Sequence, residues 1–360
     1  MPKKILTVLG ARPQFIKASV VSAAIAAHPQ LQEVVVHTGQ HFDANMSDVF
    51  FQELGMNAPQ HHLDIHGGGH GDMTGRMLIA LERVLQQERP DTVLVYGDTN
   101  STLAGALAAA KLHIPVAHVE AGLRSFNMRM PEEVNRVLTD RLSSLLFTPT
   151  DTATQHLLAE GMDAARIQQV GDVMLDVARF HGARTGENDD LLRRHGLVSG
   201  QYILVTIHRA ENTDHPQRLR AIVAALLETA RSQTVVWPLH PRTKQILQQL
   251  GLEQELASHI RLIDPVGYLD MVRLEKHCAL VLTDSGGVQK EAFFHQRPCV
   301  TVRDETEWTE LVEAGWNRLA PPESAGIIVQ AVQAALTATP GQIQPYGDGT
   351  AAARIAESLA

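Results

Sequence analysis

Two successive sets of short apolar runs are the feature that most constrains the fold of this chain. Each run is rich in Val, Ile and Leu, is bounded by Gly, Pro or Asp, and is followed by an amphipathic stretch. The first set comprises Ile5–Gly10, Glu33–Thr38, Thr92–Gly97, Val116–Glu120 and Leu145–Pro149. The second set comprises Tyr202–His208, Thr234–His240, Ile260–Asp264, Ala279–Asp284 and Cys299–Val302. Strands that alternate with helices predict an α/β protein with two Rossmann-like, doubly wound parallel-sheet domains.

The length of the chain supports the same division. At 360 residues it is longer than a single hydrophobic core usually serves. The stretch from Arg179 to Asp190 is polar, contains Gly and has weak periodicity, which is typical of a linker. We therefore expect an N-terminal domain over residues 1–180 and a C-terminal domain over residues 181–345.

Composition excludes several classes of function. The formal net charge is -9 and the charges are interspersed, so no basic stripe is available for nucleic acid. The apolar run near the N-terminus is too short for a signal peptide, and no apolar stretch approaches the roughly 20 residues of a membrane span. We expect a cytoplasmic protein with no membrane partner. Cys278 and Cys299 lie in or beside apolar runs, which predicts buried thiols and neither a disulfide nor a nucleophile.

Three carboxylates stand where parallel sheets bind ligands, beyond the carboxyl ends of the strands. Asp98 and Glu120 end apolar runs, and Glu132 begins the helix that starts at Pro131. An acid at a helix start is often only a partner of the helix dipole. A carboxylate at the end of a buried strand is costly unless it is paired or solvated at a site. We therefore predict that Asp98, Glu120 and Glu132 are catalytic.

A glycine-rich turn in the second set predicts an anion site. Ser285, Gly286 and Gly287 leave a strand and open a helix, where free backbone N–H groups suit a diphosphate. The alternative is a turn in which Ser285 or Asp284 caps the helix. Glu291 lies one to two turns along this helix and is a candidate to bind ribose hydroxyls, or else a solvated glutamate.

Cations and histidines at other strand ends complete the predicted site. Arg12 and Lys17 flank the start of the first helix and are candidates for phosphate or sugar oxygens, with ordinary surface charge as the alternative. His208 and His240 end strands of the second domain and are candidates to donate to a leaving diphosphate, unless they bond backbone carbonyls. The remaining histidines show no HExxH motif or carboxylate-completed triad, so no metal is predicted.

Six collinear motifs resemble the non-hydrolysing UDP-N-acetylglucosamine 2-epimerases. They begin at Gly10, Gly97, His118, Pro131, Thr283 and Pro345, and read GARPQFIK, GDTNST, HVEAGLR, PEEVNR, TDSGGVQ and PYGDG. The resemblance implies the GT-B architecture, with a cleft between two Rossmann-like domains and a terminal helix over residues 346–360 that crosses back to the first domain.

The resemblance also implies roles and chemistry. The implied active-site positions are Arg12, Lys17, Asp98, Glu120, Glu132 and His208, and the implied UDP-binding positions are Ser285, Gly286 and Glu291. Loss of UDP from C1 of the sugar makes the C2–H acidic enough for a carboxylate to remove, and readdition of UDP with protonation from the other face inverts C2. No cofactor or metal is implied. Which carboxylate is the base and which the acid stays open, and a homodimer is expected.

Three variant positions point to one branch of the family. Gln14, Ala210 and Lys290 make the chain similar to the enzymes that act on UDP-2,3-diacetamido-2,3-dideoxy-D-glucuronate in lipopolysaccharide O-antigen synthesis. Donors for the sugar carboxylate and the second acetamido group are then expected, with Arg124, Asn127 and Arg129 as candidates. The alternatives are a UDP-N-acetylglucosamine 2-epimerase, a GT-B glycosyltransferase with a separate acceptor, and a non-catalytic sensor of sugar nucleotides.

Overall fold

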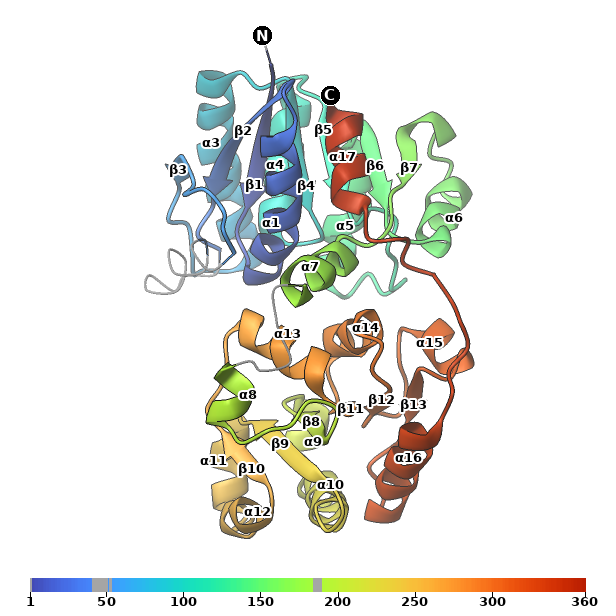
Figure 1. Ribbon diagram of the computed structural model, residues 1–360. Helices are drawn as coiled ribbons and strands as arrows, with labels where there is room; N and C mark the ends of the chain where they lie inside the picture. Colours follow the sequence, from blue (N-terminus) through green and yellow to red (C-terminus); the bar gives the residue numbers. More distant parts are fainter. Residues whose placement is uncertain (1, 41–50, 52–53, 184–189) are drawn as a thin grey trace. The chain divides into compact units, whose positions relative to one another are not determined.

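A computed structural model describes residues 2–40, 51, 54–183 and 190–360 (Figure 1). The chain forms two compact units. Unit 1 comprises Met1–Val177 and Gln344–Ala360, and unit 2 comprises Ala178–Ile343. The first boundary falls inside helix α7 (Val173–Gly182). Residues 184–189 of the predicted linker lie outside the described residues.

Unit 1 is built on a seven-stranded parallel sheet in the order β3-β2-β1-β4-β5-β6-β7. The strands are β1 (Lys3–Leu9), β2 (Leu31–His37), β3 (His61–His62), β4 (Thr92–Tyr96), β5 (Val116–Val119), β6 (Leu145–Thr148) and β7 (Ile167–Gln169). The strands β1 and β4, in the middle of the sheet, are buried on both faces, as their near-continuous apolar sequences require.

Helices cover both faces of this sheet (Figure 1). They are α1 (Arg12–Ala27), α3 (His70–Glu88), α4 (Asn100–Lys111), α5 (Pro131–Leu142), α6 (Asp151–Ala159), a 3-10 turn (Ala164–Arg166) and the first part of α7. The helices α3, α4 and α5 pack side by side, and α1 packs against α17 (Ala351–Leu359) from the C-terminus. Small residues of α4, such as Ala104 and Gly105, let that helix approach β1 and β4 closely.

Unit 2 repeats the same plan with six parallel strands in the order β10-β9-β8-β11-β12-β13. The strands are β8 (Tyr202–Thr206), β9 (Thr234–Pro238), β10 (Arg261–Ile263), β11 (Leu280–Thr283), β12 (Cys299–Thr301) and β13 (Asn317–Leu319). The helices are α8 (Asp190–Arg194), α9 (Ala210–Thr213), α10 (Pro216–Thr229), α11 (Pro241–Gln249), α12 (Glu253–His259), α13 (Tyr268–His277), α14 (Gly286–Phe294), α15 (Thr309–Glu313) and α16 (Ala325–Thr337).

All ten predicted strands are confirmed, and so is the α/β class with two doubly wound sheets. The sequence missed β3, β7 and β13, which are edge strands of two or three residues. Such short strands bury too little to leave an apolar run.

The C-terminal segment is anchored in unit 1. The backbone N–H of Asp172 donates to the carbonyl oxygen of Tyr346 at 2.9 Å. Gly171 has no side chain, which allows the two segments of the backbone to approach each other. The Asp176 carboxylate then accepts from the N–H groups of Ala351 (3.2 Å) and Ala352 (2.9 Å) and so caps α17.

The strand orders locate the candidate site. In both sheets the order reverses next to the first strand, between β1 and β4 and between β8 and β11. Ligands of open α/β sheets bind beyond the carboxyl ends of the strands at such a reversal. None of the described helices is long and apolar enough to span a bilayer.

Candidate active site

The predicted residues of unit 1 follow its central strands. Arg12 and Lys17 are on the first turns of α1, directly after β1. Asp98 comes two residues after β4, and Glu120 directly after β5. Because β1 and β4 flank the reversal of strand order, all four lie at the end of the sheet where ligands bind.

Gln14 joins the turn after β1 to the turn after β4. Its side-chain oxygen accepts from the backbone N–H groups of Gly10 (2.8 Å) and Ala11 (3.0 Å). Its nitrogen donates to the carbonyl oxygen of Tyr96 (2.8 Å) and to Oγ1 of Thr99 (3.0 Å). A carboxylate has no proton for these two acceptors, so the fully used amide explains why this buried position holds Gln and not Glu.

Lys17 and Glu120 form a nearly buried ion pair through Nζ and Oε2. Burial alone lowers the pKa of the Lys17 ammonium, but the facing Glu120, with Asp172 and Asp98 further away, raises this pKa above its ordinary value. The Lys17 side chain therefore stays protonated and carries a positive charge. A Cβ at Gly97 would lie 3.5 Å from Oε2 of Glu120, which is an ordinary contact, so the glycine is favoured here by its φ of 62° and not by lack of space.

The backbone of Glu120 is strained. Its φ is 69°, in the left-handed region where a residue with a Cβ pays about 1–2 kcal/mol. Such outliers persist where surrounding structure enforces them, and they gather at functional sites. The conformation turns the chain sharply after β5, and the Glu120 side chain pairs with Lys17.

Asp98 pairs with Arg136 of α5 through Oδ2 and Nη2. The Asp98 side chain keeps 30% of its surface exposed, so it is open to a ligand while it is held by the guanidinium. The amide of Asn135 fixes the same turn, because its nitrogen donates to the Asp98 carbonyl oxygen at 2.9 Å.

Glu133 holds the loop before α5. Its carboxylate accepts from the backbone N–H groups of Ser125 and Phe126, both at 2.9 Å, and pairs with Arg136 at 2.8 Å. Burial raises the pKa of the Glu133 carboxyl, but these bonds outweigh it and the pKa is lowered. Glu133 is structural.

Glu132 and Arg12 are both exposed at the starts of their helices. Glu132 is exposed at the second position of α5, and among the described residues its carboxylate has no hydrogen-bond or ion-pair partner. Arg12 is exposed at the first position of α1. Unit 1 therefore brings Lys17 and Glu120 together, holds Asp98 close by, and leaves Arg12 and Glu132 facing solvent.

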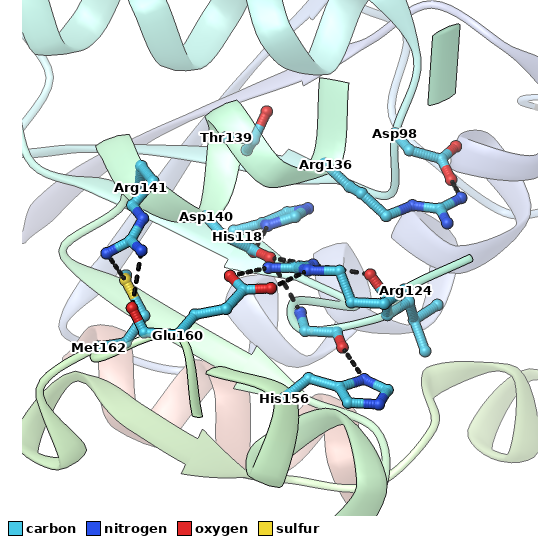
Figure 2. Close-up of polar contacts among 12 residues, drawn as sticks. Asp98, His118, Arg124, Arg136, Thr139, Asp140, Arg141, His156, Glu160 and Met162 are labelled. Atoms are coloured by element: carbon cyan, nitrogen blue, oxygen red, sulfur yellow. Dashed lines mark hydrogen bonds and ion pairs between the residues drawn. The ribbon is translucent and has the colours of Figure 1, made fainter. Parts of the chain in front are cut away.

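Arg124 serves the fold and not the substrate. Figure 2 shows its guanidinium between two acids: Nη1 donates to Asp140 at 2.7 Å, and Nε and Nη2 donate to Glu160 at 2.6 and 2.8 Å. The Arg124 side chain is only 1% exposed. The prediction that Arg124 binds a sugar carboxylate is therefore wrong, because its N–H groups already donate to Asp140 and Glu160. Asn127 and Arg129 are exposed.

In unit 2, Asp284 holds the turn after β8. The buried carboxylate accepts from the backbone N–H groups of His208 (3.1 Å) and Arg209 (3.0 Å) and from the amide of Asn212 (3.1 Å). The His208 ring lies 3.6 Å from the same carboxylate, and its side chain is 48% exposed. Asp284 thus presents His208 at the end of β8.

The start of α14 is not capped by its own side chains. Ser285 is the N-cap residue and makes no side-chain hydrogen bond to the helix. The oxygens of Asp284 accept from N–H groups of the turn after β8. Neither Ser285 nor Asp284 therefore accepts a hydrogen bond from the first amides of α14. A Cβ at Gly287 would meet no atom within 4 Å. The space beside Gly287 is therefore open, and this favours the anion-binding interpretation.

Trp308 braces the same turn. Its indole N–H donates to the carbonyl oxygen of Gly286 at 2.8 Å, and Nζ of Lys290 lies 4.4 Å above its ring. The variant residue Lys290 therefore packs beneath the anion site through Trp308. Glu291, on the next turn, is half-buried.

His240 has a structural contact of its own. Its Nδ1 accepts from the N–H of Arg242 at 3.3 Å and so caps α11. Because Nδ1 accepts, the ring proton is on Nε2, which is the atom left to act as a donor. Its predicted role in binding diphosphate stays a prediction.

The described residues hold neither a metal site nor a nucleophilic thiol. In the parts of the chain that the structure describes, no group of three or more His, Cys, Asp or Glu is placed to hold a metal ion. Cys278 and Cys299 are free and buried, and burial raises the pKa of the Cys278 thiol and raises that of Cys299 to about 12. Neither thiol is a nucleophile at neutral pH.

Sequence reasoning missed the residues that hold the turns. Gln14, His118 and Asp140 are buried and make the bonds that place Asp98 and Glu120. One signal was present, because His118 is a polar residue inside the four-residue apolar strand β5. A histidine there must find partners.

Comparisons with known proteins agree with this geometry. The family model of UDP-N-acetylglucosamine 2-epimerase matches residues 23–360. A UDP-2,3-diacetamido-2,3-dideoxy-D-glucuronate 2-epimerase of Pseudomonas aeruginosa is 57% identical over 363 residues, which cover 99% of each chain. A UDP-N-acetylglucosamine 2-epimerase of Methanocaldococcus jannaschii is 43% identical over 99% of this chain and 98% of its own.

Solved structures extend the agreement to three dimensions. The M. jannaschii enzyme in complex with UDP-GlcNAc and UDP aligns with a TM-score of 0.82 at 43% identity, covering 100% of this chain and 99% of that one. The GT-B-like fold of two parallel α/β sheets is thereby confirmed. With the match over nearly its full length, the chain belongs to the UDP-N-acetylglucosamine 2-epimerase family and is a UDP-sugar 2-epimerase, an isomerase.

Proposed function

We propose that the enzyme interconverts UDP-2,3-diacetamido-2,3-dideoxy-D-glucuronate and its manno epimer. The observation that carries the proposal is the 57% identity, over the whole chain, to a relative that bears this substrate in its name, against 43% to a UDP-N-acetylglucosamine 2-epimerase. The variant residues Gln14, Ala210 and Lys290 support it through their resemblance to that branch. Gln14 is buried in the first turn of α1, and Lys290 is buried in the second turn of α14. A place in O-antigen synthesis and a homodimer stay predictions.

The reaction is an elimination followed by an addition. The C1–O bond breaks and its electron pair leaves with UDP, while a carboxylate takes the proton from C2 and a C1–C2 double bond forms. The bound glycal then receives a proton at C2 on the opposite face as UDP adds back to C1. Atoms and charge balance, so neither an oxidant nor a reductant is needed.

Unit 1 is assigned the proton chemistry. Asp98, Glu120 and Glu132 are the candidate acid and base, since elimination and addition call for a proton acceptor and a proton donor on opposite faces of C2. Lys17 pairs with Glu120 and Arg136 pairs with Asp98, so each of these carboxylates is held in place beside a cation. Arg12 and Arg129 are exposed cations that suit phosphate oxygens and the sugar carboxylate.

Unit 2 is assigned the nucleotide. The turn over residues 285–287 suits the diphosphate through the amides of Gly286 and Gly287, since the N–H of Ser285 donates to Oγ1 of Thr283 at 2.9 Å. Glu291 suits the ribose hydroxyls. His208 and His240 suit the negative charge that grows on UDP as the C1–O bond breaks.

The experiment that tests the substrate compares initial rates for the two nucleotides with purified enzyme at matched concentrations. We expect kcat/KM to be higher for the diacetamido-uronate by about 10⁴, because cations built for a carboxylate are left unpaired by a hydroxymethyl group. Arg129→Gln should narrow that ratio. An equal or higher efficiency with UDP-N-acetylglucosamine would contradict the substrate and leave the epimerase chemistry standing.

A further inference from the structure

A buried carboxylate lies behind the two turns that carry Asp98 and Glu120. Asp140, on α5, is 1% exposed. Its Oδ2 accepts from the backbone N–H of Gly122 at 3.2 Å, and its Oδ1 lies 2.7 Å from Nδ1 of His118. Gly122 comes two residues after Glu120, so one oxygen of Asp140 anchors the turn that holds Glu120.

His118 carries the second connection. Its ring is fully buried, and Nε2 lies 2.8 Å from the carbonyl oxygen of Gly97. A carbonyl oxygen only accepts, so Nε2 must donate. Gly97 directly precedes Asp98, and the other oxygen of Asp140 therefore reaches the turn that holds Asp98 through one imidazole ring. Figure 2 shows His118 beside Asp140.

The charge of Asp140 is also fixed. Burial raises the pKa of this carboxyl, but the bonds to His118 and Arg124 outweigh burial and lower it. Arg124 is itself held by the two hydrogen bonds that it donates to the Glu160 carboxylate. The carboxylate is thus ionised and immobile, and among the described residues it touches neither solvent nor an open site.

We propose that Asp140, acting through His118, is a positioning residue that sets the distance and angle between the carboxylates of Asp98 and Glu120. The proposal rests on the proposed function, in which both carboxylates act at C2 of the sugar. The turn after β5 needs such support, because Glu120 has a strained φ of 69°. Gly97 adopts its φ of 62° without strain, and its carbonyl oxygen is the acceptor that His118 holds.

The consequence is specific to the chemical step. Substrate binding by the amides of α14 does not involve Asp140, because all of its contacts lie within unit 1. A misplacement of about 1 Å between reacting groups costs about 100-fold in rate. Loss of the Asp140 bonds should therefore lower kcat and leave UDP affinity unchanged.

The test uses the full-length enzyme and the variant Asp140→Asn. An amide has one acceptor oxygen in place of two. When that oxygen stays with Gly122 and Arg124, the NH₂ group faces His118, and the charge-assisted bond between the carboxylate and the imidazole is lost. We expect kcat to fall about 100-fold, the rate of C2 deuterium exchange to fall with it, and KM for the UDP sugar and Kd for UDP to stay within about 2-fold.

The matched control is Asp176→Asn. Asp176 is a buried carboxylate of the same unit that accepts from two backbone N–H groups, those of Ala351 and Ala352, far along the chain from the proposed site. Its variant loses a comparable set of bonds and should keep kcat within about 3-fold at temperatures where both variants are folded. If Asp140→Asn does not fold, His118→Gln takes its place, because it leaves Asp140 to bind Gly122.

The outcomes separate the two proposals. Folded Asp140→Asn, or folded His118→Gln in its place, with kcat near that of the wild type would overturn the positioning role. So would a fall in kcat of equal size in Asp176→Asn. If the wild-type enzyme neither epimerises a UDP sugar nor exchanges its C2 proton, the proposed function fails instead.

Discussion

Both carboxylate oxygens of Asp284 accept from the one backbone N–H of His208, at 3.1 and 3.2 Å, and so Asp284 ties the turn after β11 to the turn after β8. Gln14 makes the corresponding connection in unit 1, from the turn after β1 to the carbonyl oxygen of Tyr96 at the end of β4. Each unit therefore uses one buried side chain to lock the two turns at its reversal of strand order.

The variant Asp284→Asn should loosen the turn that carries His208. The amide leaves at least one buried donor of the turn unpaired, and this costs about 1–3 kcal/mol of stability. We expect urea unfolding to shift accordingly and kcat to fall more than UDP affinity. Asp304→Asn is the control, because Asp304 is 65% exposed and its ion pair with Arg218 contributes little. Equal losses in the two variants would contradict the assignment.

The ion pair of Lys17 and Glu120 should show strong coupling. Lys17→Met leaves the 9% exposed Glu120 carboxylate without its cation, which costs about 3–5 kcal/mol for a buried pair. The double variant Lys17→Met/Glu120→Gln removes both charges and should recover most of this stability without recovering activity. Chemical denaturation of the four proteins gives the coupling free energy, and additive effects would show that the pair does not act as a unit.

His208→Ala and Glu291→Ala should fail in different ways. Removing the histidine takes a donor from the departing UDP, so the loss should fall on kcat. Removing the glutamate takes acceptors from the ribose, so UDP affinity should fall by about 1–3 kcal/mol. Calorimetry with UDP and steady-state kinetics separate the two effects. Unchanged UDP binding by Glu291→Ala would remove Glu291 from the nucleotide site.

Glu275 should make the stability of the protein depend on pH. It is fully buried, and among the described residues its carboxyl oxygens have no hydrogen-bond partner. Burial, and then the charge of Glu291, raise the pKa of the Glu275 carboxyl well above its ordinary value. The folded state then holds a proton that the unfolded state releases, so stability falls as pH rises from the unfolded pKa toward the folded one.

The variant Glu275→Gln should remove this loss of stability at higher pH. Its free energy of unfolding should exceed that of the wild type at neutral pH, and the difference should shrink as pH falls toward the ordinary pKa of a glutamate. Denaturation curves at several pH values measure the difference. Glu255→Gln, on the exposed surface of α12, serves as the control with no such trend. A difference that grows toward low pH would show that the sign is wrong.

Most of the fold is predictable because central parallel strands are buried on both faces and therefore have continuous apolar sequences. Such runs located β1, β4, β8 and β11, whereas the order of the strands, and with it both reversals, is known from the structure. The edge strand β13 reads Asn-Arg-Leu and is set by pairing with β12, so its sequence carries no such signal.

The site is predictable only in part. Polar residues at strand ends, such as Asp98 and Glu120, are visible because the sequence around them is apolar. The partners that hold them come from other elements, as Arg136 and Asp140 do from α5, and a helix pattern does not reveal which strand end a side chain will meet. Arg124 was misread for this reason, since its two acids lie 16 and 36 residues further along the chain.

The central claim, that C2 is deprotonated and reprotonated while UDP leaves and returns, is tested most directly by running the reaction in heavy water. Proton NMR of the recovered UDP sugars after partial conversion reports the isotope at C2. The account predicts solvent deuterium at C2 of the epimerised product, with UDP released only in trace amounts. Epimerised product that retains full protium at C2 would contradict it.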